Sequence, residues 1–335
     1  MPKPRKELVS LDATPYYHCT SRCVRRSFLC GVDRDGRSYE HRRAWIESLL
    51  LKQAQAFSIE IAAYAIMSNH FHVVLYVDQA AAKSLTDADV VRRWHSLYQG
   101  SPLSRRFANG EALSAGERFY LDKSIRDWRS RLISISWFMR RLNETVARLA
   151  NDEDGCTGHF WEGRFKSQAL LDEKALAACM AYVDLNPIRA GLARTPETSD
   201  YTSVKKRAAQ ARRARLPNHP QQQVRHLLPF AGNPQEPMPH GIPMPLTDYL
   251  DLLDWTGRQL RQDKRGSINC DEPPILDRIG IAPGDWLHLT QHFETEFTGL
   301  VGAVTSLRSK IKHFWRERHE NRRISGLRAC SLRFT

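Results

Sequence analysis

The sequence predicts an α+β fold: a ferredoxin-like or RRM-like antiparallel sheet with helices on one face, followed by a small, mainly helical C-terminal domain. Strand and helix patterns alternate over about the first 200 residues. Two apolar runs are joined by the short polar connection MSNH, as in a hairpin. Beyond a proline-rich stretch, apolar residues recur at helical spacing.

These patterns follow a definite order. Residues 15–23 predict the first strand, and residues 41–56 predict an amphipathic helix because apolar side chains recur there at helical spacing. Residues 59–67 and 70–77 are the two apolar runs of the hairpin. Residues 84–130 are rich in charge and predict a partly helical insertion.

Three further patterns complete the first domain. Residues 133–150 predict a helix with an apolar stripe, and the segment GHFWEGRFKSQALLD predicts a turn and a strand. Asp172 is a suitable N-cap for a helix that ends before Pro187, because the residue before a proline disfavours the helical conformation. The order is therefore strand, helix, hairpin, helix, strand, helix.

Composition divides the chain into three parts. Residues 10–200 hold the alternating patterns. Residues 201–245 are predicted to be a linker, first basic and then rich in proline, since eight of the 17 prolines lie between positions 217 and 245. Residues 246–335 predict a basic, helical extension that folds as a separate unit.

Charge and composition narrow the class of protein. The chain has 335 residues and a net charge of +13, and the excess lies in the basic linker and the last thirty or so residues, which suits a nucleic-acid partner. A solvated linker and tail is the alternative. The sequence contains no run long and apolar enough for a membrane span and no apolar signal segment. Its seven cysteines include no CxxC pair. We expect a soluble, cytoplasmic protein with reduced thiols.

A His-x-His motif lies inside the second apolar run of the hairpin. Side chains alternate across a strand, so His70 and His72 share one face while Phe71 points to the other, into the core. Two imidazoles spaced this way can chelate one divalent cation. Two partly exposed histidines on a sheet face are the alternative.

A tyrosine and an asparagine lie near the end of the helix that Asp172 begins. At about 100° per residue, Tyr182 and Asn186 are only about 40° apart around the helix axis, whereas Asp184 points away. This spacing can bring a phenol and an amide together over the histidine face. The alternative is a tyrosine at the edge of the core, with Asn186 as a helix C-cap.

Four segments, in this order, resemble the REP-associated tyrosine transposases of the HUH single-strand transposase superfamily. They are YYHCTSRCVRRSFL, SNHFHVVL, GHFWEGRFKS and YVDLNPIRAGL, and the resemblance covers about residues 10 to 200. The insertion at 84–130 and the part beyond residue 200 depart from the smallest family members.

The resemblance implies a site and a reaction. Tyr182 would be the nucleophile, and His70, His72 and Asn186 would hold Mg²⁺ or Mn²⁺. The substrate would be single-stranded DNA with hairpin-forming palindromic repeats, cleaved and transferred through a 5′-phosphotyrosine intermediate in the bacterial cytoplasm. The sequence leaves open whether the protein is a monomer or a homodimer, which DNA sequence it recognises, and what activates Tyr182.

Basic and aromatic residues near the first strand and the GHFWEGRFKS segment are predicted to contact DNA. The basic ones are Arg22, Arg25, Arg26, Arg164 and Lys166, and the aromatic ones are Tyr17, Phe160 and Trp161. The same residues support a second hypothesis, a non-catalytic RRM-like module that binds single-stranded nucleic acid. A metal-dependent hydrolase using the His-x-His pair is a third, but it would need further ligands and a general base.

Overall fold

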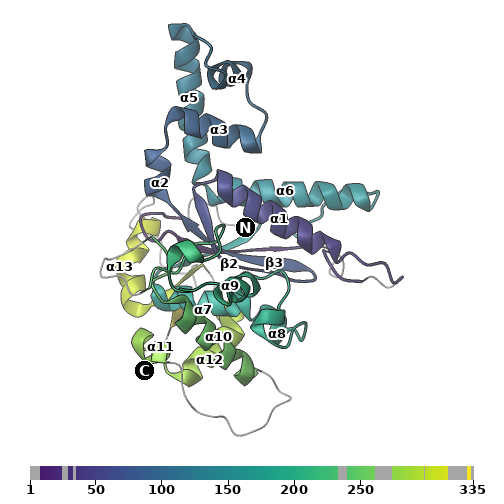
Figure 1. Ribbon diagram of the computed structural model, residues 1–335, viewed down its shortest axis with the longest axis vertical. Helices are drawn as coiled ribbons and strands as arrows, with labels where there is room; N and C mark the ends of the chain where they lie inside the picture. Colours follow the sequence, from purple (N-terminus) through teal and green to yellow (C-terminus); the bar gives the residue numbers. More distant parts are fainter. Residues whose placement is uncertain are drawn as a thin grey trace.

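The computed structural model describes residues 8–24, 29–32, 35–232, 240–260, 274–297, 299–315 and 330–332. At its centre is one sheet with the strand order β2-β3-β1-β4-β5-β6 (Figure 1). The strands are β1 (Tyr16–Arg22), β2 (Ile59–Ile66), β3 (His70–Val77), β4 (Lys166–Leu170), β5 (Leu300–Ala303) and β6 (Cys330–Leu332).

The first four strands form the antiparallel sheet that the sequence predicts. β3 pairs with β2 on one side and with β1 on the other, and β4 pairs with the far side of β1. In this register His72 lies opposite Thr20, and His70 lies opposite Arg22. β5 then joins β4 in parallel, and β6 joins β5 in parallel. The α+β class is therefore confirmed, with a mixed rather than wholly antiparallel sheet.

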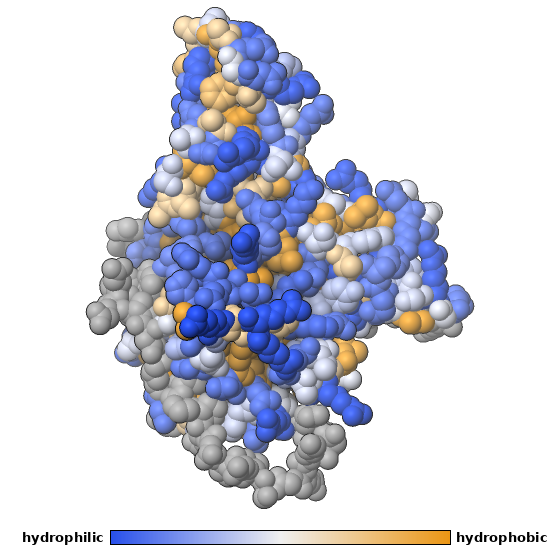
Figure 2. All heavy atoms as spheres, viewed as in Figure 1, coloured by the Kyte–Doolittle hydropathy of each residue, from blue (hydrophilic) through white to orange (hydrophobic). Residues whose placement is uncertain are grey.

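One face of the sheet is covered by α1 (His41–Ala56) and α6 (Ile135–Glu153). Odd-numbered residues of β3, beginning with Phe71, point into this core together with the apolar stripe of α6. The insertion is docked on the same side and projects from the body as an arm (Figures 1 and 2). Its helices are α2 (Gln79–Ser84), α3 (Asp87–Leu97), α4 (Pro102–Ala108) and α5 (Ala115–Leu132). Trp94 of α3 stacks on Trp128 of α5, with ring centroids 5.4 Å apart.

The other face is covered by α7 (Glu173–Asp184), which can approach closely because small side chains meet there. β2 presents Ala63 and Ala65 to this core, and α7 presents several alanines of its own. Further described helices lie on this side. They are α8 (Asn186–Arg189), α9 (Ser203–Ala211), α10 (Leu246–Leu260), α11 (Pro274–Ile279) and α12 (Pro283–Glu296), with short 3₁₀ turns at Pro196–Thr198 and Pro220–Gln222. The last described helix, α13 (Val304–Trp315), packs instead against the first core through Leu307, Ile311 and Phe314.

Two details of the prediction are corrected. Helices cover both faces of the sheet, and the C-terminal extension is not a separate unit, because it adds β5 to the sheet and α10 and α12 to the second core. The physical reason is that the second face of the sheet and α7 are apolar. Tyr249, Trp286 and Phe293 of the extension are each fully buried in the same cluster as these elements.

The predicted linker is also packed. Arg207 of α9 is buried and donates hydrogen bonds to the main-chain oxygens of Ala62 and Leu228, both at 2.9 Å. Farther along, Phe230 and Ile242 are fully buried. Part of the basic and proline-rich stretch therefore holds the extension against the sheet.

Two expectations from composition concern the thiols and the membrane. Cys19, Cys23, Cys30, Cys156 and Cys179 are free thiols, and all but Cys156 are buried. In the described part of the chain, none of the helices has the length and apolar character needed to cross a membrane.

Candidate active site

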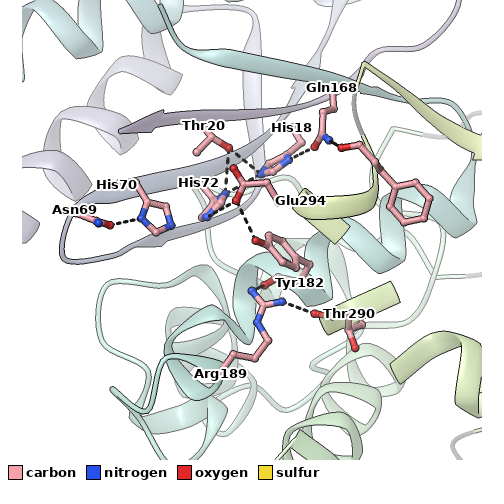
Figure 3. A network of polar contacts seen from close by, with 11 residues as sticks. His18, Thr20, Asn69, His70, His72, Gln168, Tyr182, Arg189, Thr290 and Glu294 are labelled. Atoms are coloured by element: carbon pink, nitrogen blue, oxygen red, sulfur yellow. Dashed lines mark hydrogen bonds and ion pairs between the residues drawn. The ribbon is translucent and has the colours of Figure 1, made fainter. Parts of the chain in front are cut away.

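The two histidines of β3 lie side by side on the face covered by α7. Their ring centroids are 4.7 Å apart, and Figure 3 shows both rings on the side of the sheet that faces Tyr182. Phe71 points to the opposite face, where its ring lies 5.7 Å from that of Trp161. The alternation predicted from the sequence is confirmed.

A chain of hydrogen bonds fixes the tautomer of His72. Gln168 of β4 donates its side-chain amide to the oxygen of Phe297, which turns its Oε1 toward His18 of β1. His18 therefore donates from Nδ1 to that oxygen at 2.6 Å, and its Nε2 accepts from Nδ1 of His72 at 3.0 Å. The Nε2 of His72 is left as a lone pair, and this atom is buried without a hydrogen-bond partner.

His70 is held in the same way by its neighbour in the sequence. Its Nδ1 lies 2.5 Å from Oδ1 of Asn69, an oxygen that can only accept, so His70 donates from Nδ1 and keeps a lone pair on Nε2. Histidines that bind metals usually donate their other ring N–H to a fixed acceptor. Both histidines of β3 have this arrangement.

Burial keeps these imidazoles neutral. Desolvation lowers the pKa of His72 well below its usual value, and the pKa of His18 is lowered for the same reason. The pKa of His70 is lowered to about 4, mainly by burial and then by the positive charge of Arg22. At pH 7 the three rings therefore carry no positive charge that would repel a cation.

Tyr182 lies on the third turn of α7, a helix whose N-terminus is capped by Asp172 as predicted. Its ring centroid is 5.6 Å from that of His72, and its hydroxyl donates to Oε2 of Glu294 at 3.1 Å. The guanidinium of Arg189 lies 3.8 Å from the ring centroid. Burial raises the pKa of the phenol above its usual value, an effect that Arg189 opposes and Glu294 reinforces.

The other polar residues near the end of α7 separate as the helical spacing predicts. Asp184 points away from the histidines and accepts hydrogen bonds from Ser203, Val204 and Tyr249. Asn186 begins α8 one turn after Tyr182 and is buried. Its role as a metal ligand remains a prediction.

Basic residues flank the histidines on the sheet. Arg22 lies opposite His70 in the β1–β3 pairing, and Lys166 lies opposite Thr20 in the β1–β4 pairing. Strand alternation places both on the histidine face, and both are exposed. Arg164 is exposed in the segment before β4. The remaining two predicted DNA contacts, Arg25 and Arg26, lie outside the described residues.

The aromatic residues do not form a base-stacking platform. Tyr17 is fully buried and its hydroxyl donates to the oxygen of Ser10, while Phe160 is 2% exposed. Trp161 is partly buried and donates to the oxygen of Asn143. Because helices cover both faces of the sheet, the RRM-like binding hypothesis loses the open surface on which it depends.

Four residues of the site were missed by the sequence analysis: His18, Gln168, Arg189 and Glu294 (Figure 3). The position of His18 follows from pairing the opening strand with the histidine strand, since positions 18 and 20 must share the face of His72. Gln168 lies opposite His18 in the β1–β4 pairing and so shares this face. Glu294 has no comparable local pattern. It comes from α12, 112 residues after Tyr182, in the segment predicted to be separate.

A different group of potential metal ligands lies at the other end of β3. In the described parts of the chain, Glu60, Asp78 and His240 have ligand atoms within 4.8 Å of one another. Asp78 is six residues beyond His72, which corresponds to roughly 20 Å along a strand. His240 lies 3.3 Å from a Glu60 oxygen and 3.6 Å from an Asp78 oxygen, so the two carboxylates already face the imidazole as a partner. This group is distinct from the predicted site.

Comparison with known proteins gives a likeness of fold. Among solved structures, the chain is similar to a REP-associated tyrosine transposase bound to a REP hairpin, with a TM-score of 0.37 and 14% identity over 72% of this chain and 97% of that chain. No protein-family model and no curated protein matches the chain. The structural match is to the family that the sequence motifs resemble.

Proposed function

We propose that this protein is a metal-dependent nuclease and strand transferase of the HUH type, which cleaves single-stranded DNA through a covalent bond to Tyr182. One observation carries the proposal. A phenol, 5.6 Å from the ring of His72, faces two imidazoles that each present an Nε2 lone pair on the same side of the sheet. Neither a structural tyrosine nor an RRM-like module requires this combination.

The residues present fit a divalent cation. His72 Nε2 is buried without a partner, the two rings are neutral, and their other nitrogens are held by fixed acceptors. His70 and His72 would hold the ion, with Asn186 as the further ligand that the resemblance implies. When bound, Mg²⁺ or Mn²⁺ would polarise the scissile phosphate and offset the charge that develops on it.

The protein's own part in the reaction is to position the nucleophile. The Tyr182 oxygen would form a bond to phosphorus while the bond from phosphorus to the 3′ oxygen breaks, leaving a 5′-phosphotyrosine and a free 3′-OH. The ring is held between Arg189 at 3.8 Å and Phe293, whose centroid is 5.8 Å away. A fixed ring orientation keeps the oxygen in line with the leaving group. A second 3′-OH can reverse the step and join strands.

Access to Tyr182 requires a rearrangement of the extension. The tyrosine is 8% exposed, and Phe293 and Glu294 of α12 lie against it. We expect DNA to displace the Phe293 side of α12 when it enters, while Glu294 stays at the site. Arg22 and Lys166, exposed on the sheet beside the histidines, are suited to contact the phosphates of the incoming strand.

The substitution Tyr182→Phe tests the proposed reaction. It removes one hydroxyl, so the variant should bind single-stranded DNA with nearly unchanged affinity but lose cleavage in the presence of Mn²⁺. Tyr120→Phe is the matched control, because Tyr120 is 67% exposed on α5, away from the site. Cleavage of a labelled oligonucleotide, followed on a denaturing gel, gives the result, and cleavage that persists in Tyr182→Phe contradicts the proposal.

The hairpin preference comes from the family resemblance and is tested separately. A folded single strand carrying a palindromic hairpin should bind more tightly than the fully duplex form of the same sequence. Fluorescence anisotropy at fixed salt measures both affinities. Equal affinity for both forms would indicate a general basic DNA-binding protein.

A further inference from the structure

Two hydrogen-bond acceptors face each other inside the candidate site. The hydrogen bonds from Gln168 to His18 and from His18 to His72 leave Nε2 of His72 with a lone pair and no proton. Oε2 of Glu294 lies 4.0 Å from this atom, with 22% of the glutamate side chain exposed and none of the histidine. Among the described residues, none donates a hydrogen bond to His72 Nε2. The described residues therefore supply no proton or cation between His72 Nε2 and Glu294 Oε2, although two facing acceptors require one.

The spacing suits an ion between the two atoms. Divalent metals bind imidazole nitrogen and carboxylate oxygen at roughly 2.0 to 2.2 Å, so two ligands of one ion lie up to about twice that distance apart. The nearby guanidinium does not fill the gap, because Arg189 donates to the main-chain oxygens of Tyr182 and Thr290. A bridging water is the other possible occupant.

We infer that Glu294 is a carboxylate ligand of the divalent cation that His72 and His70 hold, so that the C-terminal extension completes the metal site. The inference rests on the proposed function, which places the cation at the two histidines. A carboxylate beside two neutral imidazoles adds negative charge and the hard oxygen that Mg²⁺ and Mn²⁺ prefer.

Metal binding would then couple β3 to α12. His70, His72 and Glu294 do not form a group with all ligand atoms within 4.8 Å, so closure on one ion draws the His70 ring or the glutamate inward. The same Glu294 oxygen accepts from the Tyr182 hydroxyl at 3.1 Å, which links the ion's ligand set to the nucleophile. Bound Mn²⁺ should accordingly raise the melting temperature of the intact chain.

Isothermal titration of Mn²⁺ into the full-length protein tests the inference without any measurement of activity. The wild type should bind one ion per chain, and Glu294→Gln should bind at least about tenfold more weakly, because the substitution replaces a charged carboxylate with a neutral amide oxygen, a weaker ligand for Mn²⁺. Glu296→Gln is the matched control, since that exposed residue of the same helix pairs with His288. It should bind Mn²⁺ as the wild type does.

The outcomes separate this inference from the proposed function. If His72→Ala loses Mn²⁺ binding while Glu294→Gln keeps it, the histidine site stands and the inference is wrong. If Glu294→Gln keeps Mn²⁺ affinity and cleaves DNA faster, Glu294 is a latch on Tyr182 and not a ligand. If the wild type binds no Mn²⁺, the metal site itself fails. Should Glu294→Gln not fold, Glu294→Asp keeps the carboxylate but shortens its reach, and unchanged affinity in that variant likewise contradicts the inference.

Discussion

Two buried polar centres lie two residues apart on α7, and they differ in how their hydrogen bonds are completed. Asp184 is fully buried, and its carboxylate accepts from the Ser203 hydroxyl, the Val204 amide and the Tyr249 hydroxyl. On the other side of the helix, Tyr182 faces His72, whose Nε2 has no partner and lies 4.0 Å from a carboxylate. The acceptor of the first centre, the Asp184 carboxylate, has its hydrogen bonds supplied by the protein, whereas His72 Nε2 in the second centre has none.

An unpartnered atom alone does not distinguish them, because Arg207 near Asp184 also keeps buried N–H groups without partners. What distinguishes the second centre is two acceptors that face each other. A buried donor that bonds to a buried acceptor stabilises the fold. Two buried acceptors that face each other cannot form a hydrogen bond, so they need a cation or a donor from outside the protein between them. We therefore assign a structural role to Asp184 and a binding role to His72.

Removal of residues 246–335 should have the largest effect, because it disrupts both centres. It takes away Tyr249 from the first and Glu294 from the second, together with β5 and much of the second core. The sequence alone predicts that the extension folds as a separate unit, so that its removal leaves the rest of the chain folded, whereas the structure predicts that the truncated chain does not fold. Circular dichroism and solubility of the truncated chain decide between them, and a cooperatively folding, soluble product contradicts the shared core.

Substitution of one residue from each centre should give opposite profiles. Asp184→Ala leaves Arg207 buried without its nearby negative charge and should cost about 3 to 5 kcal/mol of unfolding free energy. Any fraction that remains folded should bind Mn²⁺ normally. His72→Ala should lose Mn²⁺ binding, with a smaller stability change. Urea denaturation and Mn²⁺ titration of both variants test this, and matching profiles would show that the two centres do not differ in role.

The pH dependence of stability should identify the Asp184 centre. Burial raises the pKa of Asp184 to about 6, so in the folded state it takes up a proton at a higher pH than in the unfolded chain. Stability from this group therefore rises as pH falls from about 6 toward 4, by at most about 3 kcal/mol. Relative to Asp184→Asn, the wild type should gain unfolding free energy over that range. A difference that stays constant with pH shows that Asp184 has an ordinary pKa.

The smallest effect on Mn²⁺ binding is expected at Gln168, which contacts His72 only through His18. Gln168→Leu removes the acceptor of His18 Nδ1, so neither His18 nor His72 is held in one tautomer. Mn²⁺ affinity should fall by about 10- to 100-fold. Gln79→Leu, at the other end of β3, is the control. If Gln168→Leu binds Mn²⁺ with wild-type affinity, the hydrogen bonds from Gln168 through His18 do not fix the tautomer in which His72 binds the metal.

The sequence predicts those parts of this arrangement that depend on local periodicity. Strand alternation places His70 and His72 on one face, and helical spacing turns Asp184 away from Tyr182. The α+β class follows from the order of the same patterns. Asp172 as the cap of α7 is likewise a local feature, and the structure confirms it.

The parts that could not be predicted depend on contacts between distant segments. Glu294 and Tyr249 reach the two centres from helices whose own periodicity shows only that they have an apolar face. Nothing in that pattern indicates which surface they cover. The proline-rich composition of 217–245 suggests an extended linker, but Phe230 and Ile242 within it are buried against the second core.

Direct mapping of the covalent adduct tests whether Tyr182 is a nucleophile beside a metal site. The full-length protein is incubated with Mn²⁺ and a hairpin-bearing single-stranded oligonucleotide, digested with protease, and examined by mass spectrometry for a nucleotide-modified peptide. We expect one adduct, on Tyr182, that forms only with metal and is absent in His72→Ala. An adduct on another tyrosine, or cleavage without any protein–DNA adduct, would contradict it.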